Sequence, residues 1–502
     1  MTDLIHRTLK YINASDGRIL IFLMLSANYV SPVISANEEA YLQLARQYMD
    51  PDWIVGSRSL TVFSGSRYLF QWVVGSWLQW FSFEVTVIVF RLLFSGLFAI
   101  VLNRLRITLG LEIFEFLVLI QALYLPQQSI FGGEWIFLGV ETKELAYVLV
   151  FLALDDLMND RTGRAIAMTV VATYFHVLVG AWFALVLFIY LSIYSRLSLR
   201  SLLKYLLTFS VGVSVHVIHL VNGIIWTQNG TIIEGVNTDW VYSYFRNSHH
   251  AGIFLDAEFF METHALGVLL TLLWFGLSLY LAVRARNSIL RRLSYLNCII
   301  FGLVLCFTVI AYFDTGGSVV KYYPFRQAAL GTLLAIFQIG IYAKYVWQKP
   351  PLVNRYANLI MIGIVFLIGT YSAGRLRSHY QRFVYHADNG MQAVASHIRA
   401  TTDPTDVFLV LDRNSFDGDL RFMRLSERER FVLEKFVPVS PTEIFQWYKR
   451  VLAKQDIIAD FNQIQDTRER YRIDYVVSNY EIKESALPAP ELIGEYRIYT
   501  MK

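Results

Sequence analysis

The sequence predicts an α-helical polytopic membrane bundle of about 11 transmembrane helices, followed by a small external α/β domain. Of the 502 residues, 55% are hydrophobic and only 17% are charged, which is less charge than a soluble chain of this length carries. The apolar residues occur in blocks of roughly 18–22, long enough to cross the ~30 Å hydrocarbon core of a bilayer. After Gly374 the long apolar runs give way to short strand patterns.

Eleven apolar runs are the expected spans. The fifth and sixth share only 31 residues, which is tight for two full crossings, so a bend between two short helices is expected in "TYFHVLVGAW", where Gly180 tolerates it. The runs are 18–34, 84–103, 109–126, 142–158, 165–178, 179–195, 202–221, 264–283, 294–312, 323–345 and 356–374.

The distribution of Lys and Arg predicts which loops face the cytoplasm. With a cytoplasmic N-terminus, the inside loops are short and basic, as the positive-inside rule requires. These loops are 103–106, 159–164, 195–200, 283–292 and 344–355. The long loops 35–83, 127–141 and 222–263 then lie on the outer side. We therefore expect a multi-pass integral protein, of the kind found in the bacterial inner membrane, with its C-terminal domain outside the cytoplasm.

Two domains are expected, a transmembrane domain over 1–374 and an extracytoplasmic α/β domain over 375–502. In the second, 406–412, 474–478 and 495–501 have strand character, and 441–454 has helical spacing. The charged run 424–438 is expected to form a solvated face, with a cover over a cavity or a polymer-binding surface as the alternatives.

Several functions are disfavoured by composition. The net charge of +4 is small and no basic stripe with interleaved aromatics is present, so nucleic acid is not an expected partner. Cys298 and Cys306 lie in one apolar run and form neither a disulfide framework nor a metal-binding spacing. No Walker-type loop is present, so ATP is not the expected donor.

The first outer loop opens with "SANEEAYLQLARQYMDPDW", which starts at Ser35. Ser35 and Glu38 have the S-x-x-E spacing of a capping box, and the residues that follow have the pattern of an amphipathic helix. Capping accounts for Glu38 but leaves Glu39 unexplained. The run 68–81 is too short to span a bilayer and reads as a second, interfacial helix.

This order of elements resembles the GT-C membrane glycosyltransferases. The shared plan is a first span, a long outer loop with an acidic pair and a helix ("NEEAYLQLARQY"), a short interfacial helix, and a second span that ends in a basic cluster ("NRLR"). Protein mannosyltransferases, aminoarabinose transferases and the catalytic subunits of oligosaccharyltransferases have this plan. The chain lacks the W-W-D-Y-G signature of the last group, and the resemblance identifies no subfamily.

The resemblance implies inverting transfer of a sugar from a polyprenyl-phosphate-linked donor to a glycan, lipid or protein acceptor on the outer face. One of Glu38 and Glu39 would be the general base, since an acceptor hydroxyl must lose its proton as the glycosidic bond forms. No redox cofactor is expected, and the need for a divalent cation stays open. The membrane lipid itself is a further expected partner.

Two other functions remain open. A non-catalytic flippase or export component for lipid-linked glycans could use the same cavity, although the paired broken repeats of transporters are not visible in the sequence. An O-antigen-type ligase or polymerase would use an outer-loop His or Arg and would not need the acidic pair.

The loop "FGGEWIFLGVETKELAY" contains Glu134, Glu141 and Lys143, and its two glycines permit unusual backbone angles. A buried charged pair at the start of a span indicates function. The structural alternative is that Glu141 favours a helix N-terminus and Lys143 extends to the interface. His176, near the outer end of a span, is a weaker candidate.

Two further loops contain candidates for phosphate or substrate binding. Arg246, His249 and His250 lie together in the loop 239–264, where a metal site is a weaker alternative and a solvated loop is the structural one. Lys321 lies in a short outer loop, and Arg326 lies just inside the next span. An Arg at that depth should face an anion, and a carrier phosphate is the natural candidate, while a structural ion pair is the alternative.

Overall fold

The structure is a computed structural model and describes residues 10–61, 67–225, 231–347, 363, 366–378, 380–381, 389–411, 416–482 and 487–502. The chain divides into two compact units. The first comprises Met1–Ser31, Ile88–His219 and Ser243–Arg382, and the second comprises Pro32–Val87, Leu220–Tyr242 and Phe383–Lys502. Each unit is described by itself, and the predicted boundary after residue 374 stays a prediction.

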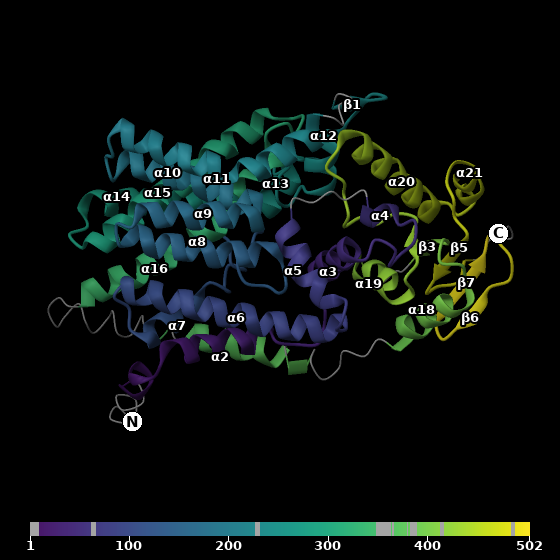
Figure 1. The fold of residues 1–502 in the computed structure, drawn as a ribbon, viewed down its shortest axis with the longest axis horizontal. Coiled ribbons are helices and arrows are strands. Elements are labelled where there is room, and N and C mark those ends of the chain that lie inside the picture. Colours follow the sequence, from purple (N-terminus) through teal and green to yellow (C-terminus); the bar gives the residue numbers. More distant parts are fainter. Residues whose placement is uncertain are drawn as a thin grey trace. The chain divides into compact units, whose positions relative to one another are not determined.

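The first unit consists of helices (Figure 1). Its longer helices run roughly parallel to one another in that view. They are α2 (Gly17–Tyr29), α6 (Phe83–Thr108), α7 (Ile113–Ala122), α8 (Thr142–Met158), α9 (Thr162–Phe175), α10 (Val177–Ile193), α11 (Leu199–Ile225), α14 (Ala265–Arg284), α15 (Ser288–Phe313) and α16 (Ala328–Trp347). The start of α6, before Ile88, and the end of α11, after His219, belong to the second unit. Shorter elements are the π-helix η1 (Val241–Arg246), α13 (Ala257–Thr263), η2 (Val320–Tyr322) and η3 (Pro324–Gln327).

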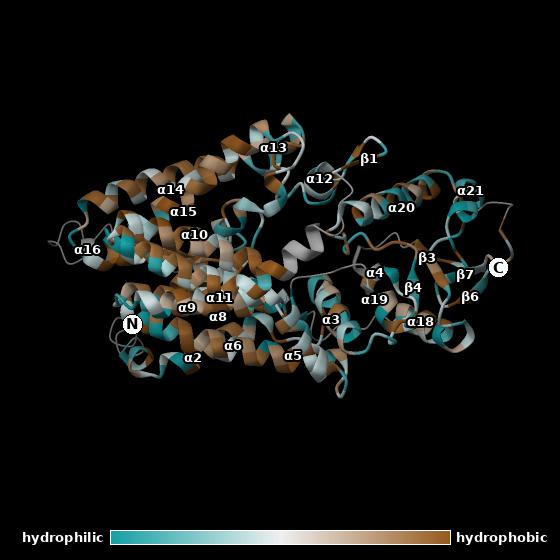
Figure 2. Ribbon diagram, turned by 45° about the horizontal axis from the view of Figure 1, so that its top comes forward, coloured by the Kyte–Doolittle hydropathy of each residue, from teal (hydrophilic) through white to brown (hydrophobic). Residues whose placement is uncertain are grey.

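Within the described residues, five helices are long and apolar enough to cross a membrane, as expected of a helical membrane protein. They are Phe83–Thr108, Leu199–Ile218, Ala265–Arg284, Ser288–Phe313 and Pro324–Tyr345. Hydrophobic residues cover much of these helices in Figure 2. The helices α2, α7 and α10 are apolar but shorter.

The count of eleven spans and the sidedness of the loops stay predictions. The run 142–158 forms α8 as expected, but this helix is not among the five membrane-crossing candidates. Its 17 residues include the buried Lys143, Glu144, Asp155 and Asp156, so both of its ends are charged. The predicted span 356–374 lies partly outside the described residues.

The predicted break between the fifth and sixth runs is a change of helix at His176. The helix α9 ends at Phe175 and α10 begins at Val177. The His176 Nδ1 atom accepts a hydrogen bond from the backbone N–H of Val179 at 3.4 Å, which caps α10. A side-chain acceptor at this position satisfies one of the donors that every helix start leaves unpaired.

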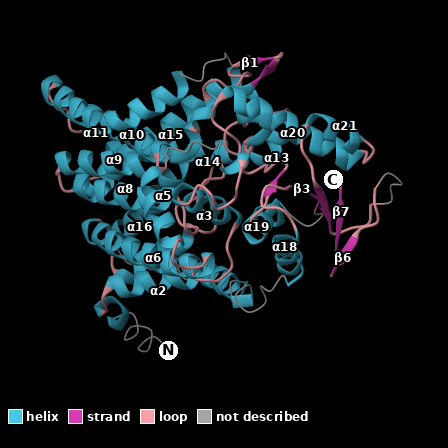
Figure 3. Cartoon of the chain, turned by 45° about the vertical axis from the view of Figure 1, so that its right-hand side comes forward, coloured by secondary structure: helices cyan, strands magenta, loops and turns pink. Residues whose placement is uncertain are grey.

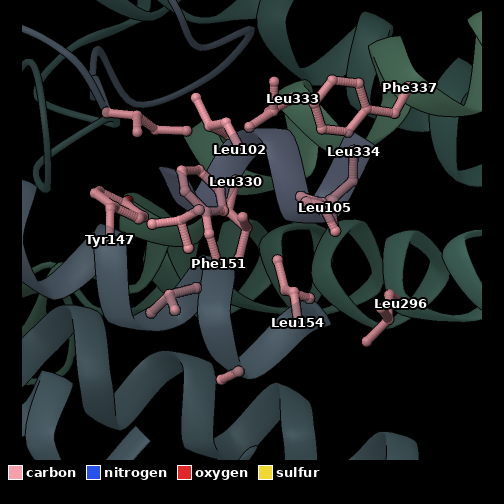
Figure 4. Packing of buried hydrophobic residues seen from close by; sticks show 14 of the residues in the cluster. Leu102, Leu105, Tyr147, Phe151, Leu154, Leu296, Leu330, Leu333, Leu334 and Phe337 are labelled. Atoms are coloured by element: carbon pink, nitrogen blue, oxygen red, sulfur yellow. The ribbon is translucent and has the colours of Figure 1, made fainter. Parts of the chain in front are cut away.

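The core of the first unit lies where α6, α8, α15 and α16 meet. Leu102, Phe151, Leu296 and Leu330 are at most 2% exposed and belong to one continuous cluster. Figure 4 shows these side chains together with those around them. Burial of such side chains stabilises the bundle by about 1.5–3 kcal/mol each in water, and inside a membrane close packing takes over that role.

The second unit begins with the helices of the first loop, α3 (Ala36–Met49), α4 (Arg58–Thr61) and α5 (Tyr68–Leu78). The predicted capping box is confirmed. Ser35 accepts from the Glu38 N–H, and Glu38 Oε2 accepts from the Ser35 N–H at 2.9 Å. The predicted second helix is also confirmed, as the 11-residue α5. A Cβ at Gly75 would overlap the carbonyl oxygen of Ala45, so α3 and α5 pack closely at this glycine.

The second unit also contains a five-stranded sheet in the order β4-β3-β5-β7-β6. Figure 3 shows the strands β3, β7 and β6 of this sheet. The predicted strands are confirmed as β3 (Val407–Leu411), β5 (Tyr475–Ser478) and β7 (Tyr496–Thr500), and the sheet is completed by β4 (Glu429–Arg430) and β6 (Glu491–Ile493). The strand β3 pairs in parallel with β4 and β5, while β7 runs antiparallel to β5 and β6.

Helices and a small hairpin accompany the sheet. The predicted helix over 441–454 is confirmed as the longer α20. The helices are α18 (Asn389–Thr401), α19 (Phe416–Ser426), α20 (Pro441–Ala459) and α21 (Gln463–Arg470), and the short segments β1 (Ile232–Ile233), β2 (Val236–Asn237) and α12 (Thr238–Trp240) contact α20 or one another.

The expectation that the run 424–438 is solvated is wrong for its centre. Arg428, Glu429 and Arg430 are at most 6% exposed. The Arg428 Nη2 atom donates to the carbonyls of Arg399 and Thr402 at 2.9 and 2.8 Å, where α18 ends. Arg428 can be buried because hydrogen bonds to the end of α18 satisfy its guanidinium, and Glu429 because its carboxylate accepts from Ser57 and Ser59.

We expect Gly75→Val to destabilise the chain by about 1–3 kcal/mol, since the added side chain forces α3 and α5 apart. The measurement is the thermal midpoint of the protein in detergent. Gly96→Ala in α6 is the control, because a Cβ there meets nothing within 4 Å. Equal midpoints for the two variants would contradict the close packing at Gly75.

Candidate functional site

A cluster of buried charges lies in the first unit, where the loop before α8 meets η3. The guanidinium of Arg326 donates to Glu134 Oε1 from Nε at 3.1 Å and from Nη2 at 3.0 Å. The Lys143 Nζ atom lies 3.3 Å from Glu134 Oε2 and 3.7 Å from Glu141 Oε2. Glu134, Glu141 and Lys143 are at most 3% exposed. The structure thus brings together four of the predicted site residues.

Two histidines complete this cluster. The His176 Nε2 atom lies 2.8 Å from Arg326 Nη1, within hydrogen-bond distance. The His250 Nδ1 atom lies 2.9 Å from the carbonyl oxygen of Gly132 and 3.9 Å from Glu134 Oε1. Glu134 is therefore surrounded by three nitrogen-bearing side chains, two of them cationic.

The local sequence explains how the cluster is built. Gly132 and Gly133 have φ angles of +73° and +58°, a backbone that glycine adopts without strain, and so the loop can turn Glu134 inward. Glu141 is the N-cap residue of α8, which places Lys143 in its first turn. Tyr323 adopts a φ of +51°, and Pro324 begins η3. The chain therefore turns at these residues, which directs Arg326 into the cluster.

The charges in this cluster balance, with two carboxylates against Arg326 and Lys143. Burial alone would raise the pKa of Glu134, but Arg326 and Lys143 outweigh it and hold the pKa well below its usual range. Burial lowers the pKa of His250, although Glu134 opposes this shift. Glu134 is therefore ionised at neutral pH and is a poor proton acceptor.

Aromatic rings and a recess adjoin the two cations. The Lys143 Nζ atom lies 3.2 Å from the centre of the Trp135 ring, and the Arg326 guanidinium lies 4.8 Å from the ring of Tyr323. Arg326 also lines a recess whose other walls, from α8, α10 and α16, are mostly apolar and include Trp182 and Phe183. A cation beside an apolar wall suits a lipid phosphate, which has one charged end and one apolar end.

Three further predicted residues come from η1, the turn that follows it, and η2. Arg246 ends the π-helix η1 and is partly buried. His249 is exposed, and its ring centre lies 4.0 Å from that of His250. Lys321, in η2, is partly buried and lies 5.4 Å from the ring of Tyr322. Their proposed contact with substrate stays a prediction.

The acidic pair of the first loop belongs to the second unit. Glu38 is fully buried and forms half of the capping box. Glu39 is 3% exposed and forms an ion pair with Arg424, whose Nε lies 2.8 Å from Glu39 Oε2. Burial raises the pKa of Glu39, and Arg424 opposes this rise. The predicted convergence of the pair with Glu134 and Arg326 on one cavity stays a prediction.

Sequence reasoning missed Arg424 and Arg91. Arg424 is 385 residues from Glu39 in the sequence, and no local pattern links them. Arg91 had a visible signal, because it interrupts the apolar run "VIVFRLLF". Its Nη1 atom donates to the carbonyls of Tyr29 and Ser31 at 2.9 and 2.7 Å, where α2 ends.

Among the described residues, no group of three or more His, Cys, Asp or Glu side chains is arranged to hold a metal ion. Comparison of the chain with known protein families finds none that matches, and comparison with curated proteins finds no similar sequence. The function must therefore be argued from the residues themselves.

We expect Glu134→Gln to destabilise the chain by about 3–5 kcal/mol, because Arg326 and Lys143 would remain buried without their shared anion. The thermal midpoint in detergent is the measurement. Glu262→Gln on the exposed face of α13 is the matched control and should change little. A midpoint unchanged by Glu134→Gln would show that the cluster does not depend on this charge.

The lowered pKa of His250 predicts a loss of stability in mild acid. A group whose folded pKa lies below its unfolded value, about 6.5 for histidine, contributes stability that is present above the unfolded value. That contribution is lost as the pH falls through the folded pKa. The midpoint should therefore fall between about pH 7 and pH 5, and less steeply in His250→Gln. Identical pH profiles would contradict the prediction.

Proposed function

We propose that the chain is a membrane glycosyltransferase that moves a sugar from a polyprenyl-phosphate-linked donor to an acceptor on the extracytoplasmic face. The observation that carries this proposal is the ordered structure of the first loop. Directly after the apolar helix α2, the chain forms α3 with two carboxylates in its first turn, and α5 packs against α3. Local structure of this kind is what the resemblance to GT-C enzymes leads one to expect.

In the proposed reaction, an acceptor hydroxyl attacks the anomeric carbon of the donor sugar. The bond from that carbon to the phosphate oxygen breaks, and polyprenyl phosphate leaves with the electron pair. The hydroxyl proton passes to Glu38 or Glu39 as general base. Attack from the side opposite the leaving group inverts the configuration at the anomeric carbon, as in one-step sugar transfer generally.

We propose that a lipid phosphate binds at the cluster around Arg326, which lies in the first unit. A phosphate gains negative charge as its bond to the sugar breaks, and fixed cations in a dry site stabilise that charge. Arg326 and Lys143 are held in place by Glu134, and the recess at Arg326 has mostly apolar walls. Any role for a divalent cation would be added to these cations.

A flippase or export component for lipid-linked glycans is the second candidate. The same recess favours it, because an Arg beside an apolar wall can hold a lipid phosphate without chemistry. A carrier has no need of a proton acceptor, however, so the acidic pair separates the two candidates.

We expect one of the variants Glu38→Gln and Glu39→Gln to fold and to lose at least about 100-fold of glycosyl transfer, the usual contribution of a general base. The measurement is release of polyprenyl phosphate by the purified chain, together with glycolipid output in the host. Glu258→Gln, an exposed carboxylate of α13, is the control. Full glycosyl transfer by both folded variants would refute the proposed transferase. Movement of lipid-linked glycan across the membrane without glycosyl transfer would favour the carrier.

A further inference from the structure

The two adjacent carboxylates of the first loop have different partners. Glu39 Oε1 accepts from Arg424 Nε at 3.1 Å and from Nη2 at 2.9 Å, and Glu39 Oε2 accepts from Arg424 Nε at 2.8 Å. The Gln43 Nε2 atom adds a contact to Oε2 at 3.3 Å. Both oxygens of Glu39 are therefore occupied by donors.

A carboxylate bound in this way is a poor general base. A base must turn a lone pair toward the substrate proton, and a fork-shaped guanidinium takes up the directions in which a carboxylate accepts. Arg424 stays charged at any working pH. If Glu39 took a proton, it would leave the guanidinium, whose side chain is only 9% exposed, without that counter-charge.

Arg424 also links three segments of the second unit. Its Nη1 atom donates to Glu84 Oε1 at 2.8 Å, so one guanidinium holds the start of α3, the start of α6 and the α19 helix on which it lies. The Gln43 Nε2 atom donates to the carbonyl of Leu420 at 2.8 Å, a second tie from α3 to α19. The first-loop helix is thus fastened to the C-terminal region at two adjoining turns.

The segment after α3 is fastened to the same region. Glu429 is 6% exposed, and its carboxylate accepts from the hydroxyl of Ser57 at 2.5 Å and from both the hydroxyl and the N–H of Ser59 at 2.9 and 3.1 Å. Arg58 forms an ion pair with Glu443 at 2.5 Å. The C-terminal region therefore fixes the position of the first loop along its whole described length before residue 62.

Because of helix geometry, the neighbouring carboxylate of Glu38 can have a different role from that of Glu39. Successive residues on an α-helix point about 100° apart, so anchoring Glu39 does not turn Glu38 the same way. Glu38 is oriented by the capping box, in which its Oε2 accepts the Ser35 N–H. The acidic pair therefore has one member fixed by an arginine and one fixed by the start of its own helix.

We propose that Glu39 and Arg424 form an anchor that positions α3 on the C-terminal region, and that Glu38 is the general base. Arg424 is thus a positioning residue, and the C-terminal region completes the active site by holding the first loop in place. The assignment of Glu38 rests on the proposed function, whereas the anchor does not.

The test replaces the anchor by an apolar pair in the full-length chain. Arg424→Met leaves the buried Glu39 without its ion-pair partner, and Glu39→Met leaves Arg424 with only the half-exposed Glu84, so we expect each variant to lower the thermal midpoint in detergent. The double variant removes both charges and should recover most of that loss. Its glycosyl transfer should fall by less than about tenfold, whereas folded Glu38→Gln should lose at least about 100-fold.

Two controls sharpen the comparison. Lys449 and Glu234 form an exposed ion pair in the same unit, and neutralising them should change neither midpoint nor transfer. Arg424→Lys keeps the positive charge but not the two-pronged guanidinium. Its glycosyl transfer should be higher than that of Arg424→Met and lower than that of the native chain.

Each outcome decides one part of the proposal. A double variant no more stable than the single ones would overturn the anchor. A double variant that folds but loses transfer as fully as Glu38→Gln would make Glu39 part of the chemistry and overturn its assignment. Full transfer by Glu38→Gln together with a stable double variant would refute Glu38 as the base, while the anchor would stand.

Discussion

Charges inside an apolar bundle are stable only where opposite charges and hydrogen bonds surround them. The first unit meets this constraint at both ends of α8. At its start, Lys143 is matched by Glu134 and Glu141. At its end, Asp155 accepts from Arg104 and from Thr108, each at 2.6 Å. The apolar packing between these two points can be close because the buried charges at both ends have partners of opposite sign.

Features set by local spacing could be predicted from the sequence. The capping box of Ser35 and Glu38, the strands β3, β5 and β7, and the helical nature of the apolar runs all follow from patterns within a few residues. The grouping of Glu134, Glu141 and Lys143 followed because they share one short loop. Arg326 could be added to this group only as a hypothesis. An apolar run indicates how deep in the membrane a residue lies, but not which neighbours its side chain faces.

Features set by distant contacts could not be predicted. The many charged residues in 424–438 predicted a solvent-exposed face. Only the fold shows that Arg428 caps α18 and that Glu429 accepts a hydrogen bond from Ser57 in the first loop. The length of α8 fits a span, yet its buried charges have partners in the preceding loop at one end and on α6 and α9 at the other. In each case a local rule was outweighed by a hydrogen bond or an ion pair to a remote segment.

In the proposed reaction, the general base and the groups that bind the phosphate need different surroundings. A carboxylate next to Arg326 and Lys143, such as Glu134, has a lowered pKa and little affinity for a proton. The cations that stabilise a leaving phosphate would therefore disable a base placed among them. A base on the first-loop helix, with its position fixed by a separate arginine that is paired to its neighbour, avoids this conflict. In that arrangement Arg424 contributes order to the first loop, because its guanidinium joins Glu39 and Glu84.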